Sequence, residues 1–82
     1  MILWGYALIK PTAANTPTAQ TITFAESFSD YPYVFTTERT SVPGTTVLGS
    51  GATNITQESA DIYASRTNTT TTEIDWLAIG LK

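Results

Sequence analysis

The residues able to do chemistry in this chain are few, and they restrict what it can do. Its 82 residues include no histidine and no cysteine, which removes thiolate catalysis and the usual zinc ligands. Acid–base catalysis would fall to carboxylates, but Asp61 and Asp75 are better explained as solvated strand residues or as partners of the two arginines. The glycines lack the strand–loop–helix context of a phosphate-binding loop. We therefore expect no enzyme, no cofactor and no metal.

The best candidate for ligand contact is the segment Arg66, Thr67 and Asn68, which we expect at a loop tip. Arginine and asparagine can hydrogen-bond the adjacent hydroxyls of a sugar. A nearby aromatic residue, Tyr63, can lie against the apolar face of a pyranose. The alternative is structural: Arg66 pairs with an acid of its own or a neighbouring subunit, and Asn68 makes the turn. The sequence leaves both open.

The charge and hydropathy of the chain exclude other partners. The net charge is −3, and only four residues are basic, which argues against nucleic-acid binding. No stretch is long and apolar enough to span a bilayer, so we expect no membrane insertion. The first residues lack the charged and apolar regions of a signal peptide. We therefore expect no secretion signal.

The elements that must position these residues are β-strands. Threonine is abundant and suits a pleated surface, and no apolar helical stripe is present. Within 60–66, Ala60, Ile62 and Ala64 predict one buried face, and Gly49 and Gly51 predict a bulge or a close backbone approach within 45–55. The predicted strands are 2–10, 20–24, 31–40, 45–55, 60–66 and 72–81. This spacing predicts a single all-β domain, 1–82, that is a small sandwich or barrel.

The first and last predicted strands are apolar on both faces. One face can cover the core, but a domain this small has little to place on the other face except a copy of itself. Without disulfides or metals, small domains usually rely on oligomerisation. We therefore predict an oligomer interface on the two terminal strands; the alternative is that loops of the same chain cover them. The expected interface residues are Trp4, Tyr6, Leu77, Ile79 and Leu81.

An aromatic cluster surrounds the third predicted strand. Tyr31, Tyr33 and Phe35 alternate along it, and Phe28 precedes it. Large aromatic side chains usually dominate a core. We therefore expect this cluster to be buried, with an exposed Tyr31 as the alternative suited to recognition.

Three ordered patterns resemble the H-type lectin domain. Residues 21–24 (TITF) precede 31–34 (YPYV), residues 54–56 (NIT) precede 60–63 (ADIY), and the chain closes with IDWLAIG at 74–80. Together they cover most of residues 20–80. The resemblance implies a six-stranded antiparallel β-sandwich that forms a trimer, or a hexamer of stacked trimers, and binds sugars in grooves between subunits.

The chain departs from that family at the sugar site. The aromatic residue and histidine of the animal lectins' sugar-contacting loop would fall at residues 65–68, where neither is present. Their arginine on the preceding strand would fall near Gly51. The resemblance therefore supports the fold more strongly than the ligand, since function belongs to sites and not to folds.

Domains of this kind also occur in bacteriophage tails, baseplates and fibres, and a short, threonine-rich chain without cysteine is more similar to those. We expect a virion module, assembled in the host cytoplasm and acting outside the cell, that contributes to host-surface carbohydrate recognition through weak multivalent contacts. The expected partners are copies of itself, other virion proteins and a host glycan. The alternative is a purely structural virion or head-decoration protein without glycan binding.

Overall fold

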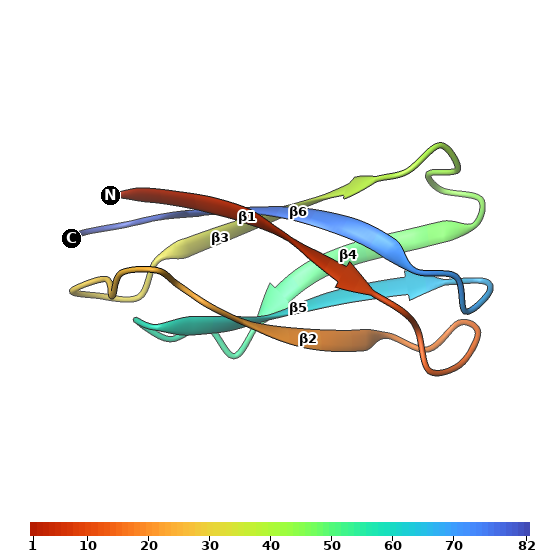
Figure 1. The fold of residues 1–82 in the computed structure, drawn as a ribbon, viewed down its shortest axis with the longest axis horizontal. Coiled ribbons are helices and arrows are strands. Elements are labelled where there is room, and N and C mark those ends of the chain that lie inside the picture. The colour runs from red at the N-terminus through yellow and green to blue at the C-terminus, as the bar shows by residue number, and fades with distance from the viewer.

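Six antiparallel strands form two three-stranded sheets that face each other in the computed structural model of residues 1–82 (Figure 1). Sheet A has the order β1-β6-β3 and sheet B the order β2-β5-β4. This confirms the all-β class, the six strands and the antiparallel pairing, and it is compatible with a β-sandwich. The strands are β1 (Ile2–Ile9), β2 (Thr18–Thr23), β3 (Tyr33–Arg39), β4 (Val47–Thr53), β5 (Ser59–Arg66) and β6 (Thr72–Ile79).

The observed strand ends differ from the predicted ones by two or fewer residues, and local chemistry explains the largest differences. β3 begins at Tyr33 because Pro32, which has no N–H, precedes it. β4 ends at Thr53 because Asn54 has a φ of 49°, in the left-handed region that interrupts a strand. The register of β4 against β5 also slips between Val47 and Gly49. The bulge that the glycines predicted is therefore present at the Val47 end of β4.

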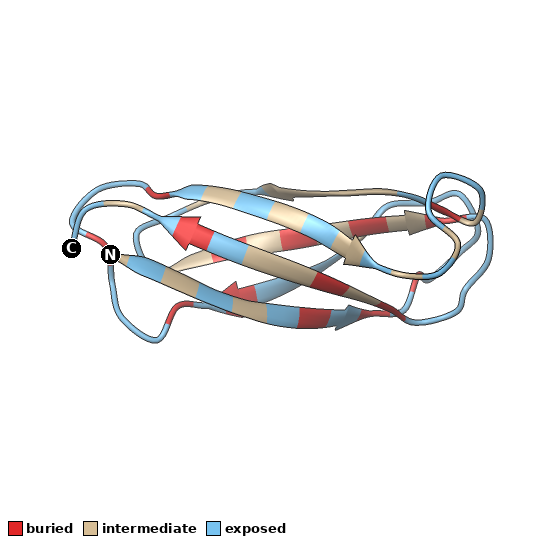
Figure 2. Ribbon diagram, turned by 90° about the horizontal axis from the view of Figure 1, so that it is seen from above, coloured by how far each residue is buried: buried red, intermediate tan, exposed pale blue.

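The core lies between the sheets and is built from alternate residues of each strand (Figure 2). Ala60, Ile62 and Ala64 of β5 are fully buried, as predicted. They face the inner side of sheet A, which includes Ile74 and Ala78. Since successive strand residues point to opposite faces, every second residue of these strands is committed to the core and the others are left for the surface.

Trp76 shapes the inner side of sheet A by packing beneath Gly5. A Cβ atom at Gly5 would lie 2.8 Å from Cζ2 of the indole, closer than van der Waals contact allows. The indole also lies 5.7 Å from the ring of Phe24, and Phe24 meets Phe28 edge to face at 5.2 Å. Gly5 is therefore required because β1 must pass close to the large ring of Trp76, which is partly buried against the core.

The prediction of a buried aromatic cluster around β3 was wrong for three of its four residues. Phe28 is buried, but Tyr31, Tyr33 and Phe35 are exposed. β3 carries apolar side chains on both faces, and its smaller residue Val34 turns toward the core. Two aromatic residues of the strand are left on the outer surface of sheet A, where they enlarge the apolar area that β1 and β6 present.

Candidate functional site

Arg66, the central residue of the predicted ligand loop, lies inside the protein. It is the last residue of β5 and only 7% exposed. Its Nε donates to Oδ1 of Asn68 at 2.8 Å, and its Nη1 donates to the hydroxyl of Thr72, which is also buried. The guanidinium thus ties the end of β5 to the start of β6. It is not displayed to a ligand in this chain.

Asn68 and Thr67 serve the same loop. Oδ1 of Asn68 also accepts a hydrogen bond from the backbone N–H of Thr70 at 3.2 Å, as expected for an asparagine that makes a turn. The backbone N–H of Thr67 donates to the carbonyl of Thr46 at 2.9 Å, while its side chain is exposed. Of the two alternatives for Asn68, the structure shows the turn.

Tyr63 lies on the other face of β5 from Arg66, because residues three apart in a strand point in opposite directions. The four predicted ligand residues therefore do not form one site. Arg66 and Asn68 belong to the loop between β5 and β6, whereas Tyr63 stands at the middle of the outer surface of sheet B. Of the four predicted ligand residues, Tyr63 is the one whose side chain faces solvent on the outer surface of a sheet.

A shallow hollow of about 310 Å³ lies around Tyr63 on the outer surface of sheet B. Tyr63 is paired with Ala19 on β2 and with Gly51 on β4. Two residues further along β5 on the same face, Ser65 is paired with Gly49. Small residues thus flank the Tyr63 ring on both neighbouring strands. The residues that line the hollow are Pro17, Gly49, Ser50, Gly51, Tyr63, Ala64 and Ser65.

The two glycines of the hollow have no requirement within the chain. A Cβ atom built on Gly49 or Gly51 would meet nothing within 4 Å, and neither residue has a positive φ. Glycine in a strand interior weakens the strand and often marks a place where a ligand or another backbone approaches closely. What these glycines do here is keep the surface beside Tyr63 open. The alternation of glycines in a strand was the sequence signal for the hollow.

Two of the three side-chain hydroxyls in the lining of the hollow, those of Tyr63 and Ser65, have no hydrogen-bond partner in the chain. Neither Oη of Tyr63 nor Oγ of Ser65 makes a hydrogen bond within the chain, whereas Ser50 turns inward and its hydroxyl pairs with that of Thr36 at 2.9 Å. No charged side chain lines the hollow. An aromatic face with free hydroxyls suits a neutral ligand that has both an apolar face and hydroxyl groups.

Asp61 stands two residues from Tyr63 on the same surface, and its carboxylate is already engaged. It accepts hydrogen bonds from Oγ1 of Thr21 at 2.6 Å and from Nδ2 of Asn54 at 2.8 Å. These hydrogen bonds lower the pKa of Asp61, and the bond from Asn54 has the larger effect. The carboxylate joins the strand edges at this end of sheet B, and no arginine pairs with it.

The outer surface of sheet A is of a different kind, and we call its eight large apolar side chains the sheet A face. Registered pairing arranges them in rows across the sheet, in which β6 stands between β1 and β3. Trp4 is 75% exposed, Tyr33 74% and Phe35 60%. The sheet A face consists of Ile2, Trp4, Tyr6, Leu8, Tyr33, Phe35, Leu77 and Ile79.

Four of the five predicted interface residues belong to the sheet A face. Trp4 and Tyr6 lie on β1, and Leu77 and Ile79 on β6. The fifth, Leu81, is exposed just beyond the end of β6. Tyr33 and Phe35 were not expected on this surface, because the sequence interpretation assigned the aromatic residues of β3 to the core.

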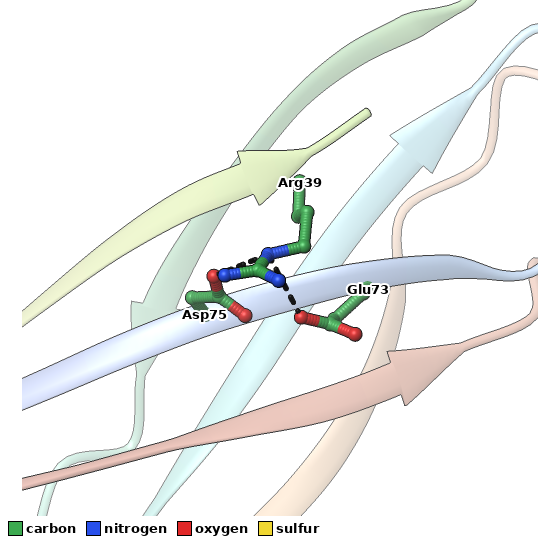
Figure 3. Close-up of polar contacts among 3 residues, drawn as sticks. All are labelled: Arg39, Glu73 and Asp75. Atoms are coloured by element: carbon green, nitrogen blue, oxygen red, sulfur yellow. Dashed lines mark hydrogen bonds and ion pairs between the residues drawn. The ribbon is translucent and has the colours of Figure 1, made fainter. Parts of the chain in front are cut away.

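One end of the sheet A surface is charged (Figure 3). Nε of Arg39 lies 3.2 Å from Oε2 of Glu73 and 3.2 Å from Oδ2 of Asp75, so one cation serves two carboxylates. Hydrogen bonding with the Asp75 carboxyl, loss of hydration and the charge of Asp75 raise the pKa of Glu73, against the opposing effect of Arg39. A groove of about 710 Å³ runs from this cluster toward Trp4 and Phe35.

The chain matches no protein-family model, and no similar curated protein or solved structure was found. The structure contains no helix that is long and apolar enough to cross a membrane. It also brings together no group of three or more side chains that could hold a metal ion.

Proposed function

We propose that this chain is an oligomeric bacteriophage virion module that contributes to carbohydrate recognition at the host surface. The observation that carries recognition is the hollow beside Tyr63, which offers an aromatic ring, free hydroxyls and glycine-lined space. The virion role rests on the ordered patterns that resemble H-type lectin domains, and the two-sheet architecture is compatible with what that resemblance implies.

Tyr63 and Ser65 have the chemistry to hold one sugar ring. The tyrosine ring packs against the apolar face of a pyranose, and the two hydroxyls exchange hydrogen bonds with those of the sugar. The volume of about 310 Å³ is at the lower end of the range for small-molecule sites. A shallow site of this kind binds weakly, and several linked copies raise the overall affinity by about 10²–10⁴ when they engage together.

The test is binding to a glycan array and to host cell-wall material by the wild type, Tyr63→Ala and Gly51→Val. We expect both variants to lose binding by about 10-fold or more, since one removes the stacking surface and the other fills the space beside it. Tyr31→Ala is the matched control, because Tyr31 is exposed outside both surfaces. Binding that survives both Tyr63→Ala and Gly51→Val would remove this site from consideration.

A purely structural virion role is the second candidate, and the exposed sheet A face favours it. In that role the chain holds neighbouring virion proteins and needs no sugar. The correctly assembled wild type would then bind no glycan and no host wall, while it would still associate with purified virion proteins. The genes on either side test the virion assignment itself: tail, fibre or head genes support it, and a non-viral neighbourhood contradicts it.

A further inference from the structure

The sheet A face is larger than the apolar patches that soluble monomers leave in water. Its eight residues are between 38% and 75% exposed. The four aromatic ones alone offer roughly 400–700 Å² when a fully exposed aromatic side chain offers about 150–250 Å², and the four aliphatic ones add to this area. The largest patch on a typical monomer is about 300–600 Å². A stable interface buries about 800 Å² on each partner. One sheet surface thus provides the area that a stable pair needs.

No loop of the chain covers this surface. Sheet B and the core occupy the inner side of sheet A, and the loops gather at the two ends of the strands (Figure 1). All six residues of the sheet A face that lie on β1 and β3 are more than half exposed, and Trp4 and Tyr33 are the most exposed. The alternative that loops of the same chain cover the outer surface of sheet A is therefore wrong for this structure.

We propose that the sheet A face packs against the same face of a second copy, about a two-fold axis that runs parallel to the strands above β6. This interface and the Tyr63 hollow lie on opposite sheets, so that either can exist without the other. Packing of two sheets face to face at about 10 Å, with strands nearly aligned, is the common arrangement of β-sheets. A two-fold interface uses the same residues on both copies.

The direction of the axis follows from the order of the rows on sheet A. The rows that contain Ile79 and Leu77 are entirely apolar, whereas those that contain Asp75 and Glu73 carry charges. When the two sheets overlap over their full length, an axis across the strands would place the row of Ile79 opposite the row of Glu73 of the second copy. An axis along the strands places each row opposite itself, so that the two apolar rows meet their own copies. The rows of Asp75 and Glu73, which also contain Tyr6 and Leu8, then meet at one end of the interface.

This arrangement specifies which residues meet. β6 lies on the axis, so Leu77 and Ile79 contact the same residues of the second copy. β1 lies opposite β3 of the second copy, which brings Trp4 over Phe35 and Ile2 over Tyr33, each twice. Because a two-fold interface requires an even number of copies, it excludes an isolated trimer.

Single cysteines test the axis without background, since the chain contains none. Leu77→Cys places one thiol beside its own copy on the axis, and we expect near-complete covalent dimer on oxidation or with a short bismaleimide linker. Leu48→Cys is the matched control, because Leu48 is a comparably exposed leucine on the other sheet. Trp4→Cys and Phe35→Cys should each give little dimer alone and a cross-linked pair when mixed.

Native mass spectrometry and analytical ultracentrifugation of the unmodified chain provide the second measurement. We expect an even number of copies, and for Phe35→Ser an association constant lower by at least about 100-fold, since two phenylalanines leave each interface. Circular dichroism checks that the variant is folded. A monomeric or odd-numbered wild type, or equal cross-linking of Leu77→Cys and Leu48→Cys, overturns the proposal; neither result bears on glycan binding through Tyr63.

Discussion

Single residues in this chain owe their roles to the direction in which the strand points them. Tyr63 and Arg66 are close in sequence, yet one faces solvent on sheet B and the other lies buried against Thr72. A spacing of three in a strand separates two side chains by the thickness of the sheet. The alternation of side chains along β5 already predicts that Tyr63 and Arg66 lie on opposite faces of the sheet. Arg66 bonds to the amide of Asn68 and the hydroxyl of Thr72 and not to an acid, because the loop after β5 brings these two residues to it.

Arg66 should act as a structural residue. Arg66→Ala removes the hydrogen bonds to Asn68 and Thr72 and leaves the buried Thr72 hydroxyl without this partner, and we expect a loss of about 1–3 kcal/mol in the free energy of unfolding. Urea denaturation measures this loss, with Arg39→Ala as the exposed control, whose ion pairs contribute about 0–1 kcal/mol. An Arg66→Ala chain of unchanged stability would show that the buried hydrogen bonds contribute nothing.

Glu73 and Asp61 should make the stability depend on pH, and their two effects should have opposite signs. The pKa of Glu73 is raised, so the folded chain holds that proton more tightly than the unfolded chain does. The free energy of unfolding should therefore rise as the pH falls from neutral to about 4.3, the ordinary pKa of glutamate. The pKa of Asp61 is lowered, so its contribution should be lost as the pH falls below about 4.

Urea denaturation at a series of pH values measures both effects, in the Phe35→Ser background so that association does not contribute. Glu73→Gln should abolish the rise, and Asp61→Asn should reduce the fall. A rise that persists in Glu73→Gln would show that another group is responsible.

At the scale of elements, each strand divides its residues between two surfaces, and the sheets differ in what they present outward. β1, β3 and β6 present many large apolar residues, while β4 and β5 present mainly glycine, serine and Asp61, with Tyr63 and Leu48 as the large residues. The two-sided character of β1 and β6 was predicted from alternation. That of β3 was missed, because both of its faces carry apolar residues and alternation does not say which face meets the core.

Glycines in the two sheets should respond differently to the same substitution. Gly5→Ala forces a methyl group to within 2.8 Å of the Trp76 ring, and we expect a loss of about 1–3 kcal/mol in the free energy of unfolding. Gly49→Ala meets open space and no positive φ, so we expect no loss or a gain of about 0.4–1 kcal/mol. Thermal and urea unfolding measure both. Equal destabilisation by the two alanines would contradict the steric account.

At the scale of the whole molecule, a small two-layer domain leaves one large apolar surface on sheet A and the Tyr63 hollow on sheet B. The proposed association through sheet A would turn the Tyr63 hollow of every copy outward. Such an arrangement suits weak contacts that gain strength by number. The same surface would also stabilise the fold, since burial of apolar area is the main favourable term available to a chain without disulfides.

Association should make the thermal stability depend on protein concentration. Anything that binds the folded chain and not the unfolded one raises the midpoint of unfolding, and for an oligomer the ligand is the chain itself. We expect the midpoint of the wild type to rise with concentration and that of Phe35→Ser to stay constant. Differential scanning calorimetry over a 100-fold range of concentration measures this. A wild-type midpoint that stays constant, with a monomer at every concentration, contradicts association.

The sequence by itself determined the all-β class, the six strands, the buried face of β5 and the two-sided terminal strands, because alternation, β-branched residues and turn residues act locally. Only the tertiary structure decided which face of β3 is buried, that Arg66 is enclosed by its own loop, and that Gly49 and Gly51 open a hollow beside Tyr63. Those outcomes depend on which strands become neighbours and in what register, and such pairing joins residues far apart in the chain that no local pattern connects.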